Sequence, residues 1–341
     1  MKRVLCLLLL SALLLTGCSG NAEPELKKFN ATFLSLFDTV TTIVGYAPTE
    51  EDFKASAQAV HDELLVYHQL FDVYNAYDGI VNLKTVNDTA ALAPVQVDQK
   101  IIDLLTDCKA YYDLTAGRVN VAMGSVLLLW HNARDHGYND PVNAALPDTG
   151  KLELAAQHVS LDDLIIDEAN CTVYFADPEL RLDVGAIAKG WALQRVCEST
   201  PEGLLISVGG NVCATGPRSS DGTDWVVGVT DPAGGEEYLH TLYLTRGSVV
   251  TSGDYQRTYM VDGKLYHHII DPDTLFPSTY WSSVTIVCED SGLADALSTA
   301  LFLLPLEEGQ AILDKAGAEA LWVDAEGNCF YSPGFKALIR T

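Results

Sequence analysis

The order of helix-like and strand-like segments along this chain is the feature that most restricts its fold. Apolar residues recur with a helical period at 51–71, and again beyond Asp98, which is placed to cap a second helix. From residue 164 onward short apolar strands dominate, with hairpin signals at 164–175 and around the Asp262-Gly263 turn. Because helices and hairpins are interspersed without a regular βαβ repeat, the sequence predicts an α+β fold with mostly antiparallel sheets and flanking helices.

Two polar stretches interrupt this pattern. Residues 73–88 are rich in Tyr and Asn, and we expect them to form a functional loop. Residues 135–150 are rich in Asn, Asp, Pro and Gly, which makes them the best candidate for a linker.

The N-terminal residues carry the pattern of a bacterial export signal. A short basic segment precedes an apolar run at 4–15, which is shorter than the roughly 20 residues that a membrane helix needs but suits a signal-peptide core. The run closes on a Leu-Thr-Gly-Cys sequence that resembles a bacterial lipobox. The resemblance implies cleavage before Cys18 and lipid attachment to its sulfur, and a plain secretory signal is the alternative.

A domain organisation follows from this signal. We expect a signal peptide at 1–17, the lipidated Cys18 with a tether at 18–29, and one domain at 30–341. The mature protein would then lie outside the cytoplasm, held to the bacterial cell membrane by its acyl chains rather than by a spanning helix.

Charge and cysteine content narrow the possible functions. A hydrophobic content of 48% indicates a folded globular chain. The formal net charge of −25 argues against nucleic acid or anionic lipid as a partner, because both would be repelled. An anionic ligand would have to be bound through a metal or through local donors. No two cysteines have C-x-x-C spacing, so zinc and redox-motif functions are weakly supported and the spacings predict no disulfide.

The segment around Asp183 is the first candidate site. Asp183 ends a strand, Gly185 provides a turn, and a helix is expected from about Ala186 to Cys197 with Lys189 one turn inside. A strand-to-helix turn of this kind exposes backbone groups that suit phosphate or metal binding. The order of residues is not that of a Walker motif, and a tight packing turn is the alternative.

Two further segments carry polar groups. His267 and His268 are expected in a strand after the Asp262-Gly263 turn, so their rings should face opposite ways and only one could reach a site. Asp295 and Thr299 fall one turn apart on a predicted helix, where a carboxylate and a hydroxyl offer hard oxygen ligands for Mg²⁺. Each feature is also common in purely structural positions.

Taken in order, these segments resemble the ApbE family, the FAD:protein FMN transferases. The matching blocks are 37–39, 183–190, 205–211, 251–255, 267–272 and 294–299, which together span nearly the whole mature chain. The resemblance implies a T-fold-related architecture with a ligand cleft between subdomains. Such enzymes split the pyrophosphate of FAD, join FMN to a Ser or Thr hydroxyl of a target protein through a phosphoester, and release AMP. The implied partners are flavin-accepting subunits of membrane electron-transfer proteins.

The resemblance also implies the roles of individual residues. Charge builds on the phosphoryl oxygens, so a metal clamp is the main requirement. The implied Mg²⁺ ligands are the Ala186 carbonyl, Asp295 and Thr299, with Ser298 as a further candidate. The implied flavin contacts are Phe37, Tyr74, Arg118, Val119, Asn120, Asp183, Lys189 and Ile269. His268 matches the active-site histidine, expected to accept the proton of the target hydroxyl or to stabilise phosphoryl charge.

The chain departs from the family pattern in two places. The family usually has Phe-Asp-Pro-Thr after a glycine, whereas Gly117 is followed here by Arg118-Val119-Asn120. A Thr-Gly pair typically follows the Asp-Pro of the histidine segment, whereas Thr274 precedes Leu275. Both changes bear on positioning near the flavin, while the implied metal ligands are intact.

Two other functions use the same features. A Mg²⁺-dependent FAD pyrophosphatase needs the same metal and flavin contacts, with water in place of the target hydroxyl. A flavin- or solute-binding lipoprotein that feeds a transporter would explain the export signal, but it gives no reason for Asp295 and Thr299 to accompany Lys189 and His268.

Overall fold

The computed structural model describes residues 25–219, 222–235 and 237–340. The signal peptide, Cys18 and most of the expected tether therefore lie outside the described residues. Within the described part of the chain, no helix is long and apolar enough to cross a membrane.

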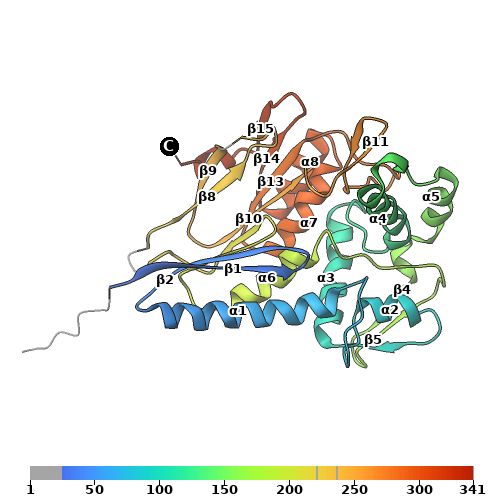
Figure 1. The fold of residues 1–341 in the computed structure, drawn as a ribbon, viewed down its shortest axis with the longest axis horizontal. Coiled ribbons are helices and arrows are strands. Elements are labelled where there is room, and N and C mark those ends of the chain that lie inside the picture. Colours follow the sequence, from blue (N-terminus) through green and yellow to red (C-terminus); the bar gives the residue numbers. More distant parts are fainter. Residues whose placement is uncertain (1–24, 220–221, 236, 341) are drawn as a thin grey trace, which may run out of the picture.

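An eight-stranded sheet forms the centre of the molecule (Figure 1). Every neighbouring pair in it is antiparallel, as the sequence predicts. In spatial order its strands are β1 (Lys27–Leu36), β2 (Thr39–Ala47), β6 (Leu204–Val208), β7 (Asn211–Ala214), β10 (Gly247–Gly253), β13 (Ser283–Cys288), β14 (Glu319–Val323) and β15 (Cys329–Tyr331).

Five helices build the main core on one face of this sheet. They are α1 (Glu50–Phe71), α3 (Gln99–Leu114), α6 (Ala188–Ser199), α7 (Ser291–Phe302) and α8 (Leu306–Ala316). Helix α1 lies along the β1–β2 hairpin (Figure 1). Its start is fixed by the Thr49 side chain, which accepts a hydrogen bond from the Asp52 backbone N–H, and by acidic residues in its first turn. Its apolar stripe, from Phe53 to Phe71, is buried against the sheet.

The opposite face of the sheet is covered by a smaller layer. The hairpin of β8 (Trp225–Thr230) and β9 (Tyr238–Leu244) packs there together with the 3₁₀ turn η4 (Phe335–Leu338). Trp225 and Phe335 are buried between this layer and the sheet.

A third group of elements has a hydrophobic core of its own. It combines α4 (Gly124–Asn139) and α5 (Thr149–Ala155) with the hairpin of β11 (Tyr259–Val261) and β12 (Lys264–Tyr266). Nearby, α2 (Leu83–Thr89) adjoins a small sheet of β3 (Val95–Gln96), β4 (Leu164–Asp167) and β5 (Thr172–Phe175). Short 3₁₀ turns η1 (Pro141–Asn143), η2 (Ala156–His158) and η3 (Leu161–Asp163) complete the chain.

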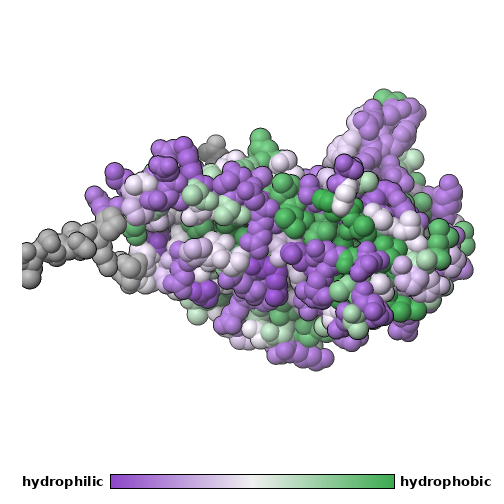
Figure 2. Space-filling model, turned by 90° about the horizontal axis from the view of Figure 1, so that it is seen from below, coloured by the Kyte–Doolittle hydropathy of each residue, from purple (hydrophilic) through white to green (hydrophobic). Residues whose placement is uncertain are grey.

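The predicted α+β class with antiparallel sheets is confirmed, but both polar stretches are more ordered than expected. Residues 73–88 end inside α2, which Asn82 caps by accepting a hydrogen bond from Thr85 N. The linker predicted at 135–150 is wrong over its first part, because α4 continues to Asn139 and η1 follows. Hydrophilic residues cover most of the face in Figure 2, and hydrophobic residues gather right of its centre.

Candidate active site

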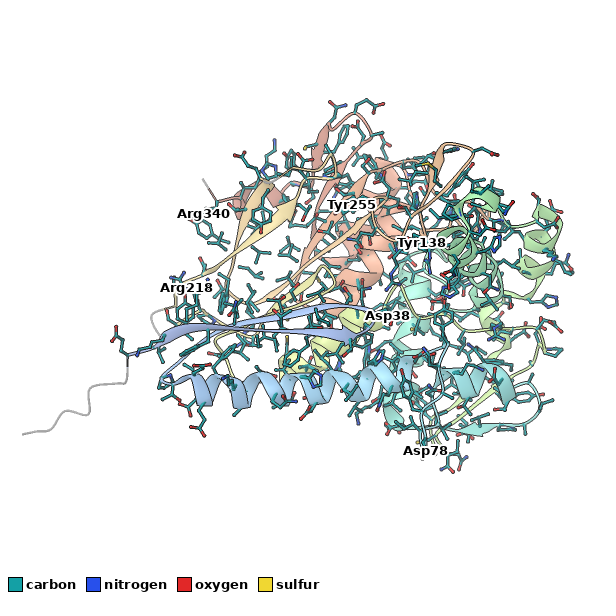
Figure 3. The ribbon with its side chains drawn as sticks, viewed as in Figure 1. Asp38, Asp78, Tyr138, Arg218, Tyr255 and Arg340 are labelled. Carbon is teal, nitrogen blue, oxygen red and sulfur yellow. The ribbon has the colours of Figure 1, made fainter. Side chains whose placement is uncertain are left out.

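A cavity of about 780 Å³, here called the main cavity, opens between the main core and the α4 core. This volume lies within the range of about 300–1,000 Å³ that small-molecule sites occupy. Its lining comes from the β1–β2 turn, the end of α1, helix α4, the start of α6, strand β10 and helix α7. Asp38 and Tyr138, labelled in Figure 3, line it from two of these elements. The expected cleft between subdomains is therefore present.

Almost all of the predicted site residues meet in the main cavity. Those that line it are Phe37, Tyr74, Arg118, Val119, Asn120, Asp183, Ala186, Lys189, His268, Ile269, Asp295 and Thr299. Ser298 is the exception, because it is fully buried behind the lining. Its hydroxyl donates to the Asp295 carbonyl at 2.9 Å and is 2.8 Å from the Ser252 hydroxyl. Ser298 thus connects α7 to β10 from behind the site.

Helices α6 and α7 touch at Gly190. A Cβ at this position would lie 2.2 Å from the Ser291 carbonyl oxygen and 2.5 Å from the Asp295 Cβ, so only glycine fits the approach. At this distance the Gly190 backbone N–H donates to Asp295 Oδ2 at 2.9 Å. The N–H groups of a first helical turn have no partner inside the helix, and here a carboxylate of the next helix supplies one.

Asp295 is only 3% exposed, and its carboxylate also makes an ionic contact. Lys189 Nζ lies 3.5 Å from Asp295 Oδ2 and donates to the Gly185 carbonyl at 3.4 Å. Ala186, in the turn before α6, and Thr299, on α7, also line the cavity. We call Ala186, Lys189, Gly190, Asp295 and Thr299 the α6–α7 wall.

A second wall faces the cavity from α4. The Tyr74 and His131 rings stack with centroids 4.3 Å apart and planes 18° apart, and the Tyr74 hydroxyl donates to Asp183 Oδ2 at 3.3 Å. His131 Nδ1 accepts from Arg134 at 2.9 Å, and its Nε2 lies 3.1 Å from an Asp135 carboxylate oxygen. Burial lowers the pKa of His131, so its ring is neutral near pH 7. We call these five residues the α4 wall.

The histidine pair lies beyond a strand rather than inside one. Strand β12 ends at Tyr266, so the predicted strand placement of His267 and His268 is wrong. The cause is local: the Ile269 N–H donates to His267 Nδ1 at 3.2 Å, which bends the chain away from the ladder. His267 Nε2 donates to the Ser278 carbonyl at 2.8 Å, so both of its ring nitrogens are occupied.

His268 is the chemically available member of the pair. Its Nδ1 lies 3.2 Å from the Gln256 carbonyl, which can only accept, so Nδ1 carries the proton and Nε2 keeps a lone pair. Burial, together with the positive charge of Arg257, lowers the pKa of His268 to about 3. The ring is therefore neutral near pH 7, and its Nε2 lone pair is unprotonated.

The turn between β1 and β2 forms part of the rim and is strained. Phe37 and Asp38 have φ values of 52° and 53°, in the left-handed region that side chains disfavour. The Phe37 N–H donates to His68 Nδ1 at 3.2 Å, and its carbonyl accepts from Arg257 at 3.4 Å. Such strain costs on the order of 1–3 kcal/mol per residue and is typical of functional sites.

The Arg118 segment is linked directly to the loop after the histidines. Arg118 Nη1 donates to Asp273 at 2.6 Å and lies 3.6 Å from Asp271. This contact joins the two regions in which the sequence departs from the family pattern.

Several charged or titratable lining residues were not predicted from the sequence. His131 and Arg134 lie on α4, a helix that was not expected, and Arg257 follows the Gly253 turn. The cavity lining carries four cations, Arg118, Arg134, Lys189 and Arg257. It also carries five carboxylates, Asp38, Asp72, Asp135, Asp183 and Asp295, so its formal charge is 4 − 5 = −1.

Comparison with known proteins agrees with this geometry. The sequence matches the model of the ApbE family over residues 37–322. The chain belongs to the ApbE family. It is 31% identical over 266 residues to the FAD:protein FMN transferase of Klebsiella pneumoniae (strain 342), covering 74% of this chain and 79% of that protein. It is 34% identical over 277 residues to the protein of the same name from Treponema pallidum (strain Nichols), covering 76% and 75%.

Solved structures place the fold in the ApbE family as well. The crystal structure of the ApbE protein of Thermotoga maritima superposes with a TM-score of 0.81 at 30% identity, covering 92% of this chain and all of that chain. The flavin transferase ApbE of Vibrio cholerae superposes with a TM-score of 0.75 at 22% identity, with the same coverage. The second similarity supports the fold alone.

Proposed function

We propose that this protein is a Mg²⁺-dependent FAD:protein FMN transferase, which moves FMN from FAD to a Ser or Thr hydroxyl of a target protein and releases AMP. The observation that carries the proposal is that Lys189, Asp295 and His268 line one cavity although they lie far apart in the sequence. The names of the Klebsiella and Treponema relatives support the same reaction.

The α6–α7 wall fits a magnesium ion. The Ala186 carbonyl, the Asp295 carboxylate and the Thr299 hydroxyl form an all-oxygen set of the kind that Mg²⁺ prefers. A lining with a formal charge of −1 would repel a pyrophosphate, so a bound divalent cation would also correct the charge balance. When bound, the metal would neutralise charge on the phosphoryl oxygens. Ser298 would hold Asp295 in place from behind rather than act as a ligand.

The protein's own groups account for the remaining requirements. The hydroxyl oxygen attacks the phosphorus of the FMN half, and the bond from that phosphorus to the bridging oxygen breaks so that AMP leaves. His268 Nε2 would take the hydroxyl proton, since Nδ1 is fixed as a donor to Gln256. Lys189, at the start of α6, would stabilise the charge on the pyrophosphate together with the helix N-terminus.

Tyr74 and Asp183 would hold the flavin, as would Phe37 and the backbone of 118–120 with Ile269. All of these residues line the main cavity, and Tyr74 is 40% exposed. The Tyr74 ring is held by the stack with His131 on one face and by the hydrogen bond from its hydroxyl to Asp183. A ring fixed in this way suits contact with a planar heterocycle.

Export and anchoring belong to the same proposal. Cleavage before Cys18 and its lipidation would place the enzyme outside the cytoplasm, on the membrane that holds its flavin-accepting partners. Intact-mass measurement of the membrane fraction would test this, because an unmodified N-terminus would contradict it.

A flavinylation assay decides among the candidate functions. The purified protein is incubated with FAD, Mg²⁺ and threonine-containing peptides, and the products are weighed by mass spectrometry. A peptide gain of one FMN with release of AMP supports the transferase. Free FMN and AMP without that gain would indicate a pyrophosphatase, and unchanged FAD would indicate a binding protein.

A further inference from the structure

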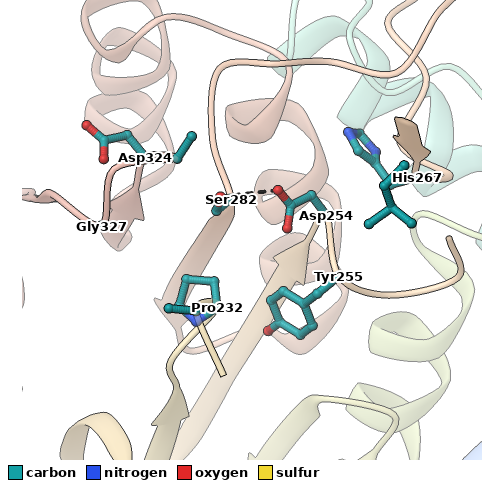
Figure 4. Close-up of a pocket in the computed structure, with 10 residues that line it drawn as sticks. Pro232, Asp254, Tyr255, His267, Ser282, Asp324 and Gly327 are labelled. Atoms are coloured by element: carbon teal, nitrogen blue, oxygen red, sulfur yellow. Dashed lines mark hydrogen bonds between the residues drawn. The ribbon is translucent and has the colours of Figure 1, made fainter. Parts of the chain in front are cut away.

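A second cavity of about 360 Å³, here called the side cavity, lies against His267 (Figure 4). It is formed at the end of β10, after β14 and by the loop that follows β8. Among the residues that line it are Pro232, Asp254, Tyr255, His267, Ser282 and Asp324.

One stretch of chain separates the two cavities. Thr251 and Ser252 line the main cavity, Asp254 and Tyr255 line the side cavity, and Gln256 with Arg257 line the main cavity again. His267 lines both, and the next residue, His268, lines the main cavity. The side cavity therefore lies back to back with the proposed reaction centre across a partition one residue thick at His267.

Hydrogen bonds within the chain hold this partition in place. Both ring nitrogens of His267 are hydrogen-bonded within the chain, to Ile269 N and to the Ser278 carbonyl. On the other side, the Asp254 carboxylate accepts from the Ser282 hydroxyl at 3.1 Å, and the Asp254 N–H donates to the Ser282 carbonyl at 3.0 Å. These bonds make the side cavity a formed surface rather than a gap between loose loops.

Transfer to a protein requires two substrates at the same phosphorus. FAD would fill the main cavity, so the acceptor hydroxyl must reach His268 from outside it. We propose that the side cavity holds the extended segment of the flavin-accepting protein next to its Ser or Thr, an inference that rests on the proposed function. Its position beside the reaction centre, with His267 lining both cavities, is the observation that favours this occupant.

The lining indicates the chemistry of that segment. Two carboxylates, Asp254 and Asp324, line the side cavity, and its described lining includes no Lys or Arg. Neutral or basic side chains are therefore favoured next to the hydroxyl, and acidic ones are repelled. Tyr255, 37% exposed, and Leu265, 52% exposed, offer apolar surface that an extended peptide could cover.

Arginine substitutions at the rim test the inference. Ala233 and Ala325 are exposed and line the side cavity, so Ala233→Arg and Ala325→Arg add bulk and positive charge without disturbing the core. Ala55→Arg, on the exposed side of α1, is the matched control. The probes are short peptides with one threonine flanked by alanine, lysine or glutamate.

We expect each rim variant to raise the KM for the alanine-flanked peptide by about tenfold or more, with an unchanged Kd for FAD. The Ala55→Arg control should keep the wild-type values of both constants. Asp254→Asn, which keeps an acceptor for Ser282, should reduce the preference for lysine-flanked over glutamate-flanked peptides. Peptide transfer with an unchanged KM in both rim variants would overturn the inference alone. Absence of transfer by the wild type to every peptide would overturn the proposed function, and the inference with it.

Discussion

The two walls of the main cavity are built in different ways. The α6–α7 wall belongs to the main core, and its central contact is set by backbone: Gly190 N–H bonds the buried Asp295 carboxylate. Three residues of the α4 wall lie on a helix that packs in a separate core, and the contacts of this wall are made by side chains, with Tyr74 stacked on His131. A wall fixed by packed helices suits a charged group whose geometry must not change, whereas a stacked wall can adjust to a flat ring.

The largest effect should come from the charge of the α6–α7 wall. Asp295→Asn keeps an acceptor for Gly190 N–H but removes the carboxylate. We expect AMP release and FMN transfer to fall by about 10²–10³-fold, because loss of a charge-stabilising group at a phosphoryl site has this scale.

Activity at saturating Mg²⁺ is the measurement, with Asp314→Asn, an exposed aspartate on α8, as the matched control. Full activity of the Asp295 variant would show that the α6–α7 wall does not hold a metal. The proposed difference in function between the two walls would then be wrong.

The His268 variant, changed on the loop that follows β12, should have the next largest effect. His268→Gln removes the proton acceptor, and we expect transfer to fall by about 10²-fold, the usual scale for a general base. His136→Gln, on the exposed side of α4, is the control. Wild-type transfer by the His268 variant would remove this ring from the mechanism.

The same variant tests the electrostatics of the loop. The folded-state pKa of His268, about 3, lies below the value of roughly 6.5 for an unfolded histidine, so the unfolded state takes up the proton first. His268 therefore costs stability progressively as the pH falls from about 6.5 toward 3. Urea unfolding at several pH values should show a shallower acid loss for His268→Gln than for the wild type; equal slopes would contradict this account.

A smaller effect tests whether backbone contact fixes the α6–α7 wall. Gly190→Ala would force its Cβ against Ser291 and Asp295, and we expect a loss of about 1–3 kcal/mol in the free energy of unfolding. Gly309→Ala on α8 is the matched control, since the nearest atom to its new Cβ is 3.4 Å away. That variant should be neutral or gain up to about 1 kcal/mol. Equal effects of the two substitutions on the urea midpoint would remove the special role of the Gly190 contact.

The smallest effect should come from the α4 wall. His131→Ala deletes the ring on which Tyr74 stacks, and a stacked pair contributes about 0.5–1.5 kcal/mol. We expect the KM for FAD to rise by about two- to tenfold with little change in kcat, because the loss affects binding rather than charge. His131→Phe restores a ring and should recover most of the affinity; a fall in kcat in both variants would instead assign His131 a chemical role.

The sequence predicts the α6–α7 wall better than the α4 wall for a physical reason. Helix α7 has a capping aspartate and a clear apolar pattern, and the turn before α6 is marked by Gly185. Helix α4 has no side-chain N-cap, its apolar residues are crowded into 126–130, and its last turn resembles a linker in composition. Local signals of helix formation are weak there, and the helix depends on its separate core.

Contacts between residues far apart in the sequence could not be predicted from the sequence alone. Gly190 and Asp295 are 105 residues apart, and nothing in either segment specifies that they touch. The placement of His267 beyond β12 likewise depends on a hydrogen bond from the Ile269 backbone N–H to the His267 ring. Strand propensity does not predict such a bond.

Trp130 gives the main cavity an optical property. Its indole is 4% exposed, is held by a hydrogen bond from Nε1 to the Leu275 carbonyl at 2.9 Å, and lines the cavity, whereas Trp191, Trp225, Trp281 and Trp322 do not. A flavin bound beside it would absorb at the wavelengths at which the indole emits. The molecule thus carries an intrinsic fluorophore in the lining of its main cavity, and binding of a flavin there can be followed as a loss of ultraviolet emission, without a label.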